Sequence, residues 1–532
     1  MKKKMTCLLL TAVLLLGCLS GCGKGAGESA ATTKPGETGA PATQGQTEQK
    51  NGESKDAQDQ GEIVNIVWQC PFAGEFGEGF YRMEDALNEM MEKDIGVHVT
   101  FERTDLGTST TDATLMLSAG EQLDIIFSLG SNIKNAIDSG LVIPIDDLCE
   151  TYGQDIIEQS GSLMDTYVVD GKLYGMSVVG PLHMDFGYNM KKEYAEKYNC
   201  MPEDGKIYSL KELEAIFETI REGEGKDTIM FVPWNNTYEP LNYNLCAYDK
   251  LGGDLSWGVL MLEGESRDPE KIVNLFETEE YAEFCRTMYD WAQKGYISAD
   301  AAVTSDLPDD ICKRDNVVGT FAYGAPDPRL KQMPSWSKEV VVFNTVAPFR
   351  AGGTAGALWQ ITSSCENPEK AMEALNYLFK NKKAAWLIQY GFEGEEYEIV
   401  ETDGDNALAR WLSDTPGELP YYNVYGLWGN MLDLPVFEPQ DILNNQIRRE
   451  IGENLPADRV SPAVGYSFDS TSVTSDLAAI QTVIAQYAPT LNAGAIDPEK
   501  ALPEFIEALK AAEIDKVIAE NQRQYDEFLN AK

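Results

Sequence analysis

Histidine and closely paired cysteines are the scarcest chemical features of this sequence. Only two histidines, His98 and His183, occur among 532 residues. The ten cysteines are widely spaced, and no two of them form a C-x-x-C pair. A Ser-His-Asp triad or a His-rich metal site therefore has almost no residues to draw on. The spacing also disfavours a zinc site or a dense disulfide framework, so we expect mostly buried cysteines and no cofactor.

Basic residues are scarce relative to acidic ones. The chain has 43 lysines and arginines against 86 aspartates and glutamates, which gives a net charge of -43. A surface of this charge repels phosphates, so it argues against nucleic-acid binding. It argues equally against a polybasic contact with a membrane. We expect a strongly hydrated surface and a monomer.

An apolar run at residues 8–19, preceded by lysines at positions 2–4, opens the chain. The run is shorter than the ~20 residues that a membrane-spanning helix needs, but it suits the core of a secretory signal. Residues 19–22, LSGC, resemble the lipobox of bacterial lipoproteins. The resemblance implies cleavage before Cys22 and diacylation of its sulfur, with a signal peptide at 1–21. The alternative is an ordinary signal peptide with an incidental cysteine.

Residues 23–61 contain Gly, Ser, Thr, Pro, Gln, Glu and Lys with hardly an apolar side chain. Such a composition cannot bury enough surface to fold. We therefore predict a lipidated flexible tether over residues 22–61. The rest of the chain is too long for one ordinary hydrophobic core, so two large lobes are expected.

Strand and helix patterns alternate where folding begins, near residue 62. Strands are predicted at residues 63–68, 96–101 and 124–128, and the segments between them have apolar residues at helical spacing. This alternation predicts a parallel sheet covered by helices on both faces. Ligands bind beyond the carboxyl ends of such strands. The loops after Trp68 and Phe127 are therefore candidate sites, and the second contains Ser128, Gly130 and Ser131.

Several motifs in a fixed order carry a family resemblance. They are LDIIF at 123–127, GLVIPIDDL at 140–148, DGKLYGM at 170–176, NVVGTFAYG at 316–324 and NPEKA at 367–371. Together they resemble the family 1 extracellular solute-binding proteins, the sugar receptors of ABC importers. GFEGEEY at 391–397, GLWGN at 426–430 and helical patterns within 468–528 are similar to the LipO-type subgroup, which has its own C-terminal module.

The resemblance implies an α/β, two-lobe fold of the type II periplasmic-binding-protein kind. We expect lobe 1 at 62–184 and 345–380, lobe 2 at 185–344 and 381–466, and a C-terminal helical module at 467–532. Crossings between the lobes are expected near 180–188, 325–346 and 380–390. The implied function is capture of an oligosaccharide between the lobes, followed by delivery to the transmembrane subunits of an ABC permease.

Aromatic rings at strand ends or crossings are the candidate sugar contacts. A tyrosine or tryptophan ring presents an apolar face and a polar tip, which suits a sugar. The candidates are Trp234, Tyr323, Trp359 and Trp428, and the resemblance places Tyr323 on the strand that carries a stacking aromatic. Asp185 at the first crossing is the candidate hydroxyl acceptor.

Three alternatives stay open at this point. A surface glycan hydrolase would need two carboxylates ~5–9.5 Å apart across a cleft, and no motif isolates such a pair. A peptide-binding receptor and an adhesion or scaffold lipoprotein are also compatible with the sequence. Asp300, Asp306, Asp309 and Asp310 could bind calcium, but they lack the spaced D-x-D-x-D-G pattern, which favours a solvated loop.

Replacement of Cys22 by serine tests the predicted anchor. The variant should lose acylation, because serine has no thiol to carry the diacylglyceryl group, and it should remain unprocessed or be shed. Metabolic labelling with a fatty-acid analogue, beside the wild-type chain, measures this. Undiminished label in Cys22→Ser would contradict the lipoprotein prediction.

Overall fold

A computed structural model describes residues 63–129, 133–169, 171–233, 246–251, 258–304, 306, 308–332, 334, 336–337, 339–352 and 357–531. Contacts divide the chain into residues 1–58 and 59–532. All described elements belong to the second unit. Cys22, Gly130, Ser131 and Trp234 lie outside the described residues.

The first lobe is built on a five-stranded sheet with the order β2-β1-β3-β13-β6. Its strands are β1 (Val64–Pro71), β2 (Val97–Thr104), β3 (Ile125–Leu129), β6 (Met176–Ser177) and β13 (Ala357–Ile361). β2 and β3 both pair parallel with β1, as predicted, whereas β13 returns from far along the chain and pairs antiparallel with β3. The first lobe is therefore not contiguous in sequence.

Alternate residues of β1 face opposite sides of this sheet, as the pleat of a strand requires. Ile66 and Trp68 join the core beneath α1 and α11, while Val67 joins a smaller core beneath α2 and α3. A strand buried on both faces explains why residues 63–68 are almost continuously apolar. The helices are α1 (Glu78–Ile95), α2 (Ser109–Ala119), α3 (Ile133–Asp138), α4 (Asp146–Tyr152), α5 (Gln154–Ser160), α11 (Pro368–Lys380) and α12 (Lys382–Tyr390).

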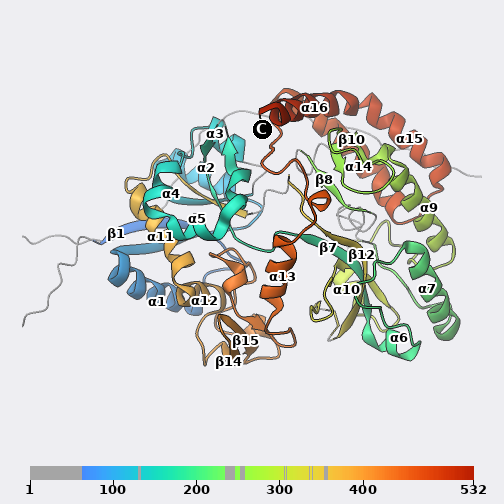
Figure 1. The fold of residues 1–532 in the computed structure, drawn as a ribbon, viewed down its shortest axis with the longest axis horizontal. Coiled ribbons are helices and arrows are strands. Elements are labelled where there is room, and N and C mark those ends of the chain that lie inside the picture. Colours follow the sequence, from blue (N-terminus) through green and yellow to red (C-terminus); the bar gives the residue numbers. More distant parts are fainter. Residues whose placement is uncertain are drawn as a thin grey trace, which may run out of the picture. The chain divides into compact units, whose positions relative to one another are not determined.

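The second lobe is organised around β7, the central strand of the antiparallel sheet β11-β7-β12 (Figure 1). The strands of the second lobe are β7 (Met184–Lys191), β8 (Tyr248–Lys250), β9 (Gly258–Met261), β10 (Val273–Asn274), β11 (Gly319–Tyr323) and β12 (Val340–Phe349). Its helices are α6 (Lys192–Lys197), α7 (Leu210–Glu224), α9 (Glu279–Gln293) and α10 (Pro308–Cys312). A capping box formed by Ser209 and Glu212 begins α7.

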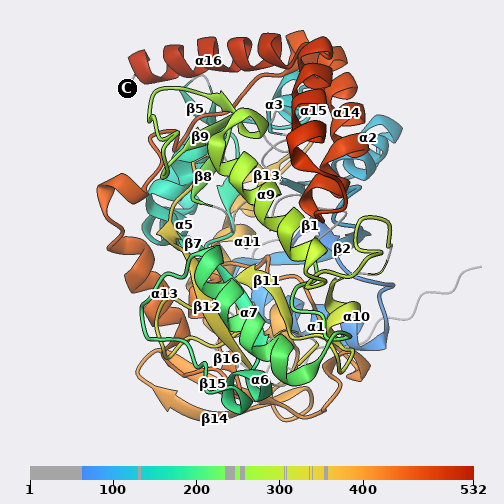
Figure 2. The ribbon, with the colours of Figure 1, turned by 90° about the vertical axis from the view of Figure 1, so that its right-hand side faces the viewer.

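Three C-terminal helices complete the core of the second lobe (Figure 2). They are α14 (Thr474–Asn492), α15 (Pro498–Ala511) and α16 (Ile514–Ala531). Phe505 of α15 packs against Phe276 with ring centroids 4.8 Å apart. Tyr525 of α16 is fully buried in the same core. These helices therefore pack on a lobe, as the sequence predicted, and share its core instead of forming a separate one.

A further small sheet, in the order β14-β15-β16, follows the first lobe's helices in sequence. It comprises β14 (Tyr397–Asp403), β15 (Asn406–Trp411) and β16 (Val436–Phe437), and Trp411 stacks on Phe437 at 4.1 Å. Helix α13 (Asn444–Glu453) comes next. A short hairpin of β4 (Val168–Val169) and β5 (Lys172–Leu173) precedes β6.

The cores divide the chain differently from the prediction in one place. Ala384 and Ile388 of α12, with Tyr421 and Trp428, belong to the first lobe's core and not to lobe 2. The crossing expected at 380–390 is therefore absent, because the apolar face of α12 is already buried in the first lobe. The chain instead returns from the first lobe to the second in the segment around α13, where Val460 forms a β-bridge with Arg350.

Trp68, Trp359 and Trp428 form one aromatic cluster in the first lobe's core. Trp68 lies 5.5 Å from each of the other two rings, and Trp359 stacks on Trp428 at 4.8 Å. All three are at most 2% exposed. Trp428 thereby attaches the segment between β15 and β16 to the core built from β1 and β13.

Truncation of Trp428 to alanine tests this packing role. Removal of a fully buried tryptophan leaves a large cavity, so the free energy of unfolding should fall by about 3–5 kcal/mol. Tyr81→Ala is the matched control, because Tyr81 lies on α1 with 53% of its surface exposed. Denaturant unfolding of both variants measures the difference, and an equal loss for the two would contradict the core assignment.

Candidate functional site

The start of β7 is a tightly packed polar region where the chain enters the second lobe. The Gly324 N–H donates to the backbone carbonyl of Asp185 at 3.0 Å. The Asn344 side chain holds Ala325, accepting from its N–H at 2.8 Å and donating to its carbonyl at 2.9 Å. A Cβ on Gly324 would lie 2.8 Å from Asp185 Oδ1 and 2.9 Å from Asn344 Oδ1. Only glycine lets β11 leave the sheet this close to both side chains.

Three ionisable groups meet at this entry point. His183 Nε2 lies 3.1 Å from Asp185 Oδ2, and Arg448 Nη1 of α13 lies 3.9 Å from the same oxygen. Asp185 is 3% exposed and the His183 ring is fully buried. Within the described part of the chain, Asp185 Oδ1 and both His183 ring nitrogens have no hydrogen-bond partner. Buried polar atoms of this kind are costly unless a water or a ligand satisfies them.

Tyr323 supplies an exposed aromatic surface beside these groups. It ends β11, is 64% exposed, and stacks on Phe186 with ring centroids 5.8 Å apart at 21°. Its backbone carbonyl accepts from Asn189 Nδ2 at 3.0 Å. One ring face is thus supported by Phe186, and the exposed remainder of the ring has the geometry needed to stack against a sugar.

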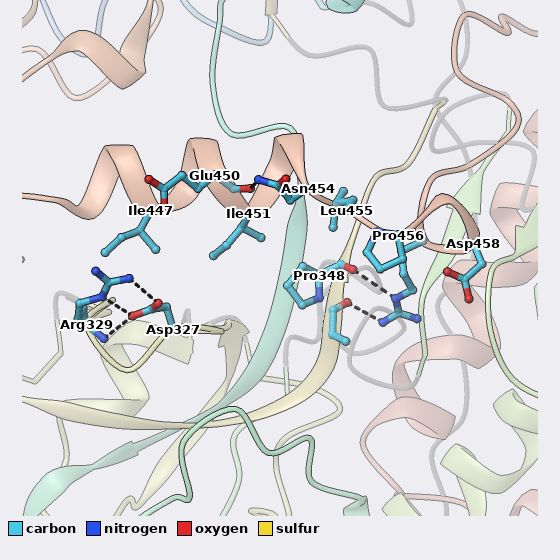
Figure 3. A pocket seen from close by; sticks show the side chains of 12 residues that line it. Asp327, Arg329, Pro348, Ile447, Glu450, Ile451, Asn454, Leu455, Pro456 and Asp458 are labelled. Atoms are coloured by element: carbon cyan, nitrogen blue, oxygen red, sulfur yellow. Dashed lines mark hydrogen bonds and ion pairs between the residues drawn. The ribbon is translucent and has the colours of Figure 1, made fainter.

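A groove of about 640 Å³ lies between α13 and the crossing strand β12 (Figure 3). Ile447 and Ile451, one helical turn apart on α13, point into it toward the side of Asp327 and Arg329. Pro348 near the end of β12 forms part of the wall. Arg448, next to Ile447 on α13, lies 3.9 Å from Asp185, so α13 borders both the groove and the entry point of β7. We call this cavity the α13 groove.

Charged side chains line the rim of the α13 groove. Arg329 donates to Asp327 through Nε at 2.9 Å and through Nη2 at 2.8 Å. The Arg329 guanidinium accordingly lowers the pKa of the Asp327 carboxyl. Arg459 pairs with Glu263 and donates to the carbonyl of Ala347 at 2.8 Å. The groove therefore combines an apolar wall with hydrogen-bonding groups, as small-ligand sites do.

The structure corrects two of the predicted aromatic contacts. Trp359 and Trp428 lie in the first lobe's core, and the Trp359 indole N–H donates to the carbonyl of Leu427 at 2.9 Å. Their rings pack on each other and on Trp68, so no ring face is open to a ligand. Both residues were predicted at strand ends or crossings, but Trp359 is the middle residue of β13, and both ring faces are buried where three segments meet.

The other predicted site residues are distributed between the lobes. Tyr323 and Asp185 come together at the start of β7, as described above. Ser128 lies in β3 with no exposed surface, and its hydroxyl has no hydrogen-bond partner among the described residues. No group of three or more metal-ligating side chains occurs in the described ranges, including the described members of the acidic cluster at 300–310.

Sequence reasoning missed Arg448, Asn344 and the α13 groove. Arg448 contacts Asp185, which lies more than two hundred positions earlier, and Asn344 bonds to Ala325 across a long loop, so the spacing of residues in the sequence reveals neither contact. A signal for the groove was present, because Ile447 and Ile451 have helical spacing and the Asp327–Arg329 pair follows the Tyr323 strand. None of the described helices is both long and apolar enough to cross a membrane.

Comparisons with known proteins agree with this architecture. The family model of a bacterial extracellular solute-binding protein matches residues 86–392, and a domain of unknown function, DUF3502, matches residues 462–530. A carbohydrate ABC transporter substrate-binding protein of Streptococcus pneumoniae serotype 4 is 27% identical over 499 residues, which is 90% of this chain and 94% of that protein.

Solved structures share the fold. The N-glycan transport solute binding protein NgtS of Streptococcus pneumoniae superposes with a TM-score of 0.74 at 22% identity, over 88% of this chain and 99% of that one. Its complex with Man5GlcNAc gives a TM-score of 0.64 at 23% identity, over the same shares. The family model covers more than half of the chain and matches a binding family, in agreement with the prediction that the chain is not an enzyme. The chain therefore belongs to the bacterial extracellular solute-binding proteins.

Proposed function

We propose that this chain is the lipid-anchored receptor of an ABC importer and captures an oligosaccharide between its two lobes. The observation that carries the proposal is the entry point of β7. There the exposed Tyr323 ring lies beside buried polar atoms, Asp185 Oδ1 and His183 Nδ1, that have no hydrogen-bond partner among the described residues. A sugar offers both a C–H face for the ring and hydroxyls for the polar atoms.

The relatives support the same ligand class. The curated relative is a carbohydrate transporter's binding protein, and the similar fold of NgtS was solved with Man5GlcNAc. In our proposal, ligand binding favours the closed arrangement of the lobes, because contacts from both lobes are made only there. Tyr323 stacks on the sugar and Asp185 accepts from a hydroxyl. Ser128, Gly130, Ser131 and Trp234 remain predicted contacts.

Asp327 of the α13 groove is poorly suited to the general acid that glycan hydrolysis needs. A general acid needs a raised pKa, so that it still carries a proton near neutral pH. Asp327 in the α13 groove has a lowered pKa because Arg329 donates to it. A receptor should return its ligand intact, so recovery of unaltered oligosaccharide after prolonged incubation distinguishes the two functions.

A thermal-shift screen of the mature chain with Cys22→Ser tests the ligand class. The panel contains Man5GlcNAc, lacto-N-tetraose, maltopentaose and short peptides of similar mass. We expect an oligosaccharide to raise the melting temperature, because a ligand that binds only the folded state stabilises it. A shift produced by peptides alone would support the peptide-binding alternative and contradict the proposal.

Replacement of Tyr323 by alanine tests the stacking contact. Loss of a stacked ring removes ~1.5–3 kcal/mol of burial, so affinity for the oligosaccharide found in the screen should fall roughly ten- to a hundredfold. The melting temperature without ligand should barely change, because most of the ring is exposed. Calorimetric titration beside Tyr81→Ala, an exposed tyrosine on α1, measures the effect. Unchanged affinity in Tyr323→Ala would place the site elsewhere.

A further inference from the structure

The α13 groove carries an excess of negative charge. Its lining includes three carboxylates, those of Asp327, Glu450 and Asp458, and two guanidiniums, those of Arg329 and Arg459. The number of charges alone does not decide what the groove binds. What matters is which of these groups still has hydrogen-bonding capacity for a ligand.

Both guanidiniums are already engaged by the protein. Arg329 presents two N–H groups to the Asp327 carboxylate at 2.9 Å and 2.8 Å, the bidentate arrangement in which arginine binds a carboxylate. Arg459 is ion-paired with Glu263 and donates to the carbonyls of Ala347 and Pro348, the latter at 3.3 Å. Figure 3 shows the Arg329–Asp327 pair. A carboxylate on a ligand would therefore have to compete with an internal carboxylate for either cation.

Two of the lining carboxylates, in contrast, retain acceptor capacity. Glu450 accepts one hydrogen bond, from Gln446 Nε2 at 2.8 Å, and has no ion pair within the described part of the chain. Asp458 is exposed and likewise has no ion pair among the described residues. Carboxylate oxygens are strong acceptors for hydroxyl donors. They repel another carboxylate, and the net charge of -43 adds to that repulsion.

We propose that the α13 groove selects uncharged oligosaccharides against those that carry carboxylates, such as sialylated or uronate-containing chains. Glu450 and Asp458 accept hydrogen bonds from hydroxyls of the uncharged sugar, and the paired Arg329 and Arg459 offer no cation to an acidic one. This inference rests on the proposed function, since it names the class of glycan that the same receptor takes.

Matched pairs of glycans test the selection with the mature Cys22→Ser chain. The pairs are lacto-N-tetraose with sialyl-lacto-N-tetraose, and Man5GlcNAc with the same glycan oxidised at one C6 to a carboxylate. For any pair that binds, calorimetric titration should give about three- to tenfold weaker binding of the acidic member, as expected for like charges near a protein surface. The ratio should approach one as salt rises from about 0.02 M to about 0.5 M, because these groups are exposed to screening.

Three variants separate charge from shape. Asp327→Asn removes the carboxylate that holds Arg329, and Glu450→Gln removes an unpaired one, so each should bring the affinity of the acidic glycan closer to that of the neutral one. Glu453→Gln is the matched control, because Glu453 is an exposed residue on the same helix that does not line the groove. It should leave the ratio unchanged. Melting curves identify any variant that fails to fold. If Asp327→Asn fails to fold, Glu450→Gln alone tests the role of the carboxylates.

The possible outcomes are distinguishable. The inference is supported if the neutral members bind more tightly and if the ratio of neutral to acidic affinity responds to salt and to Glu450→Gln. Acidic members that bind equally well or more tightly at low salt overturn it and leave the proposed function standing. The inference is also overturned if Glu450→Gln and Glu453→Gln change the ratio of neutral to acidic affinity equally. No binding of any glycan in these pairs or in the screen overturns the proposed function and this inference together.

Discussion

The close approach of β11 to the start of β7 is the constraint on which the rest of the second lobe and the site depends. β7 is the central strand of its sheet, and the chain enters it directly from the first lobe. Gly324 passes Asp185 and Asn344 at a distance that admits no side chain. This fixes the direction of the loop that follows, and with it the position of Asp327 and Arg329 opposite α13.

The candidate site therefore consists of groups that the fold brings together from distant parts of the chain. Asp185 comes from the first crossing and Tyr323 from the end of β11. Arg329 comes from the loop after β11, and Arg448 from a helix that follows the small sheet. No one of these segments would form the site alone. Burial also matters, since it removes the water that would otherwise form hydrogen bonds with Asp185 and His183.

Much of the fold could be predicted from the sequence because its signals are local. The alternating strands and helices of residues 63–140 and the capping box at Ser209 depend on neighbours within a few positions. Trp428 is a residue whose position local signals do not predict. Its short loop has no periodic pattern, so nothing nearby reveals that it packs on Trp68, 360 positions earlier in the chain. Tyr323 could be predicted as exposed because it ends a strand, whereas its neighbour Arg448 could not be placed at all.

The shared core of the second lobe has a consequence for how the chain acquires its structure. The central strand of this lobe, β7, is complete at residue 191, but Phe505 and Tyr525 fill the lobe's interior from the last thirty residues. A chain that emerges N-terminus first cannot close this core until its synthesis or export is almost complete. Until then, the apolar surfaces of α9 and β9 stay uncovered, and chaperones or prompt release determine whether the lobe folds or aggregates.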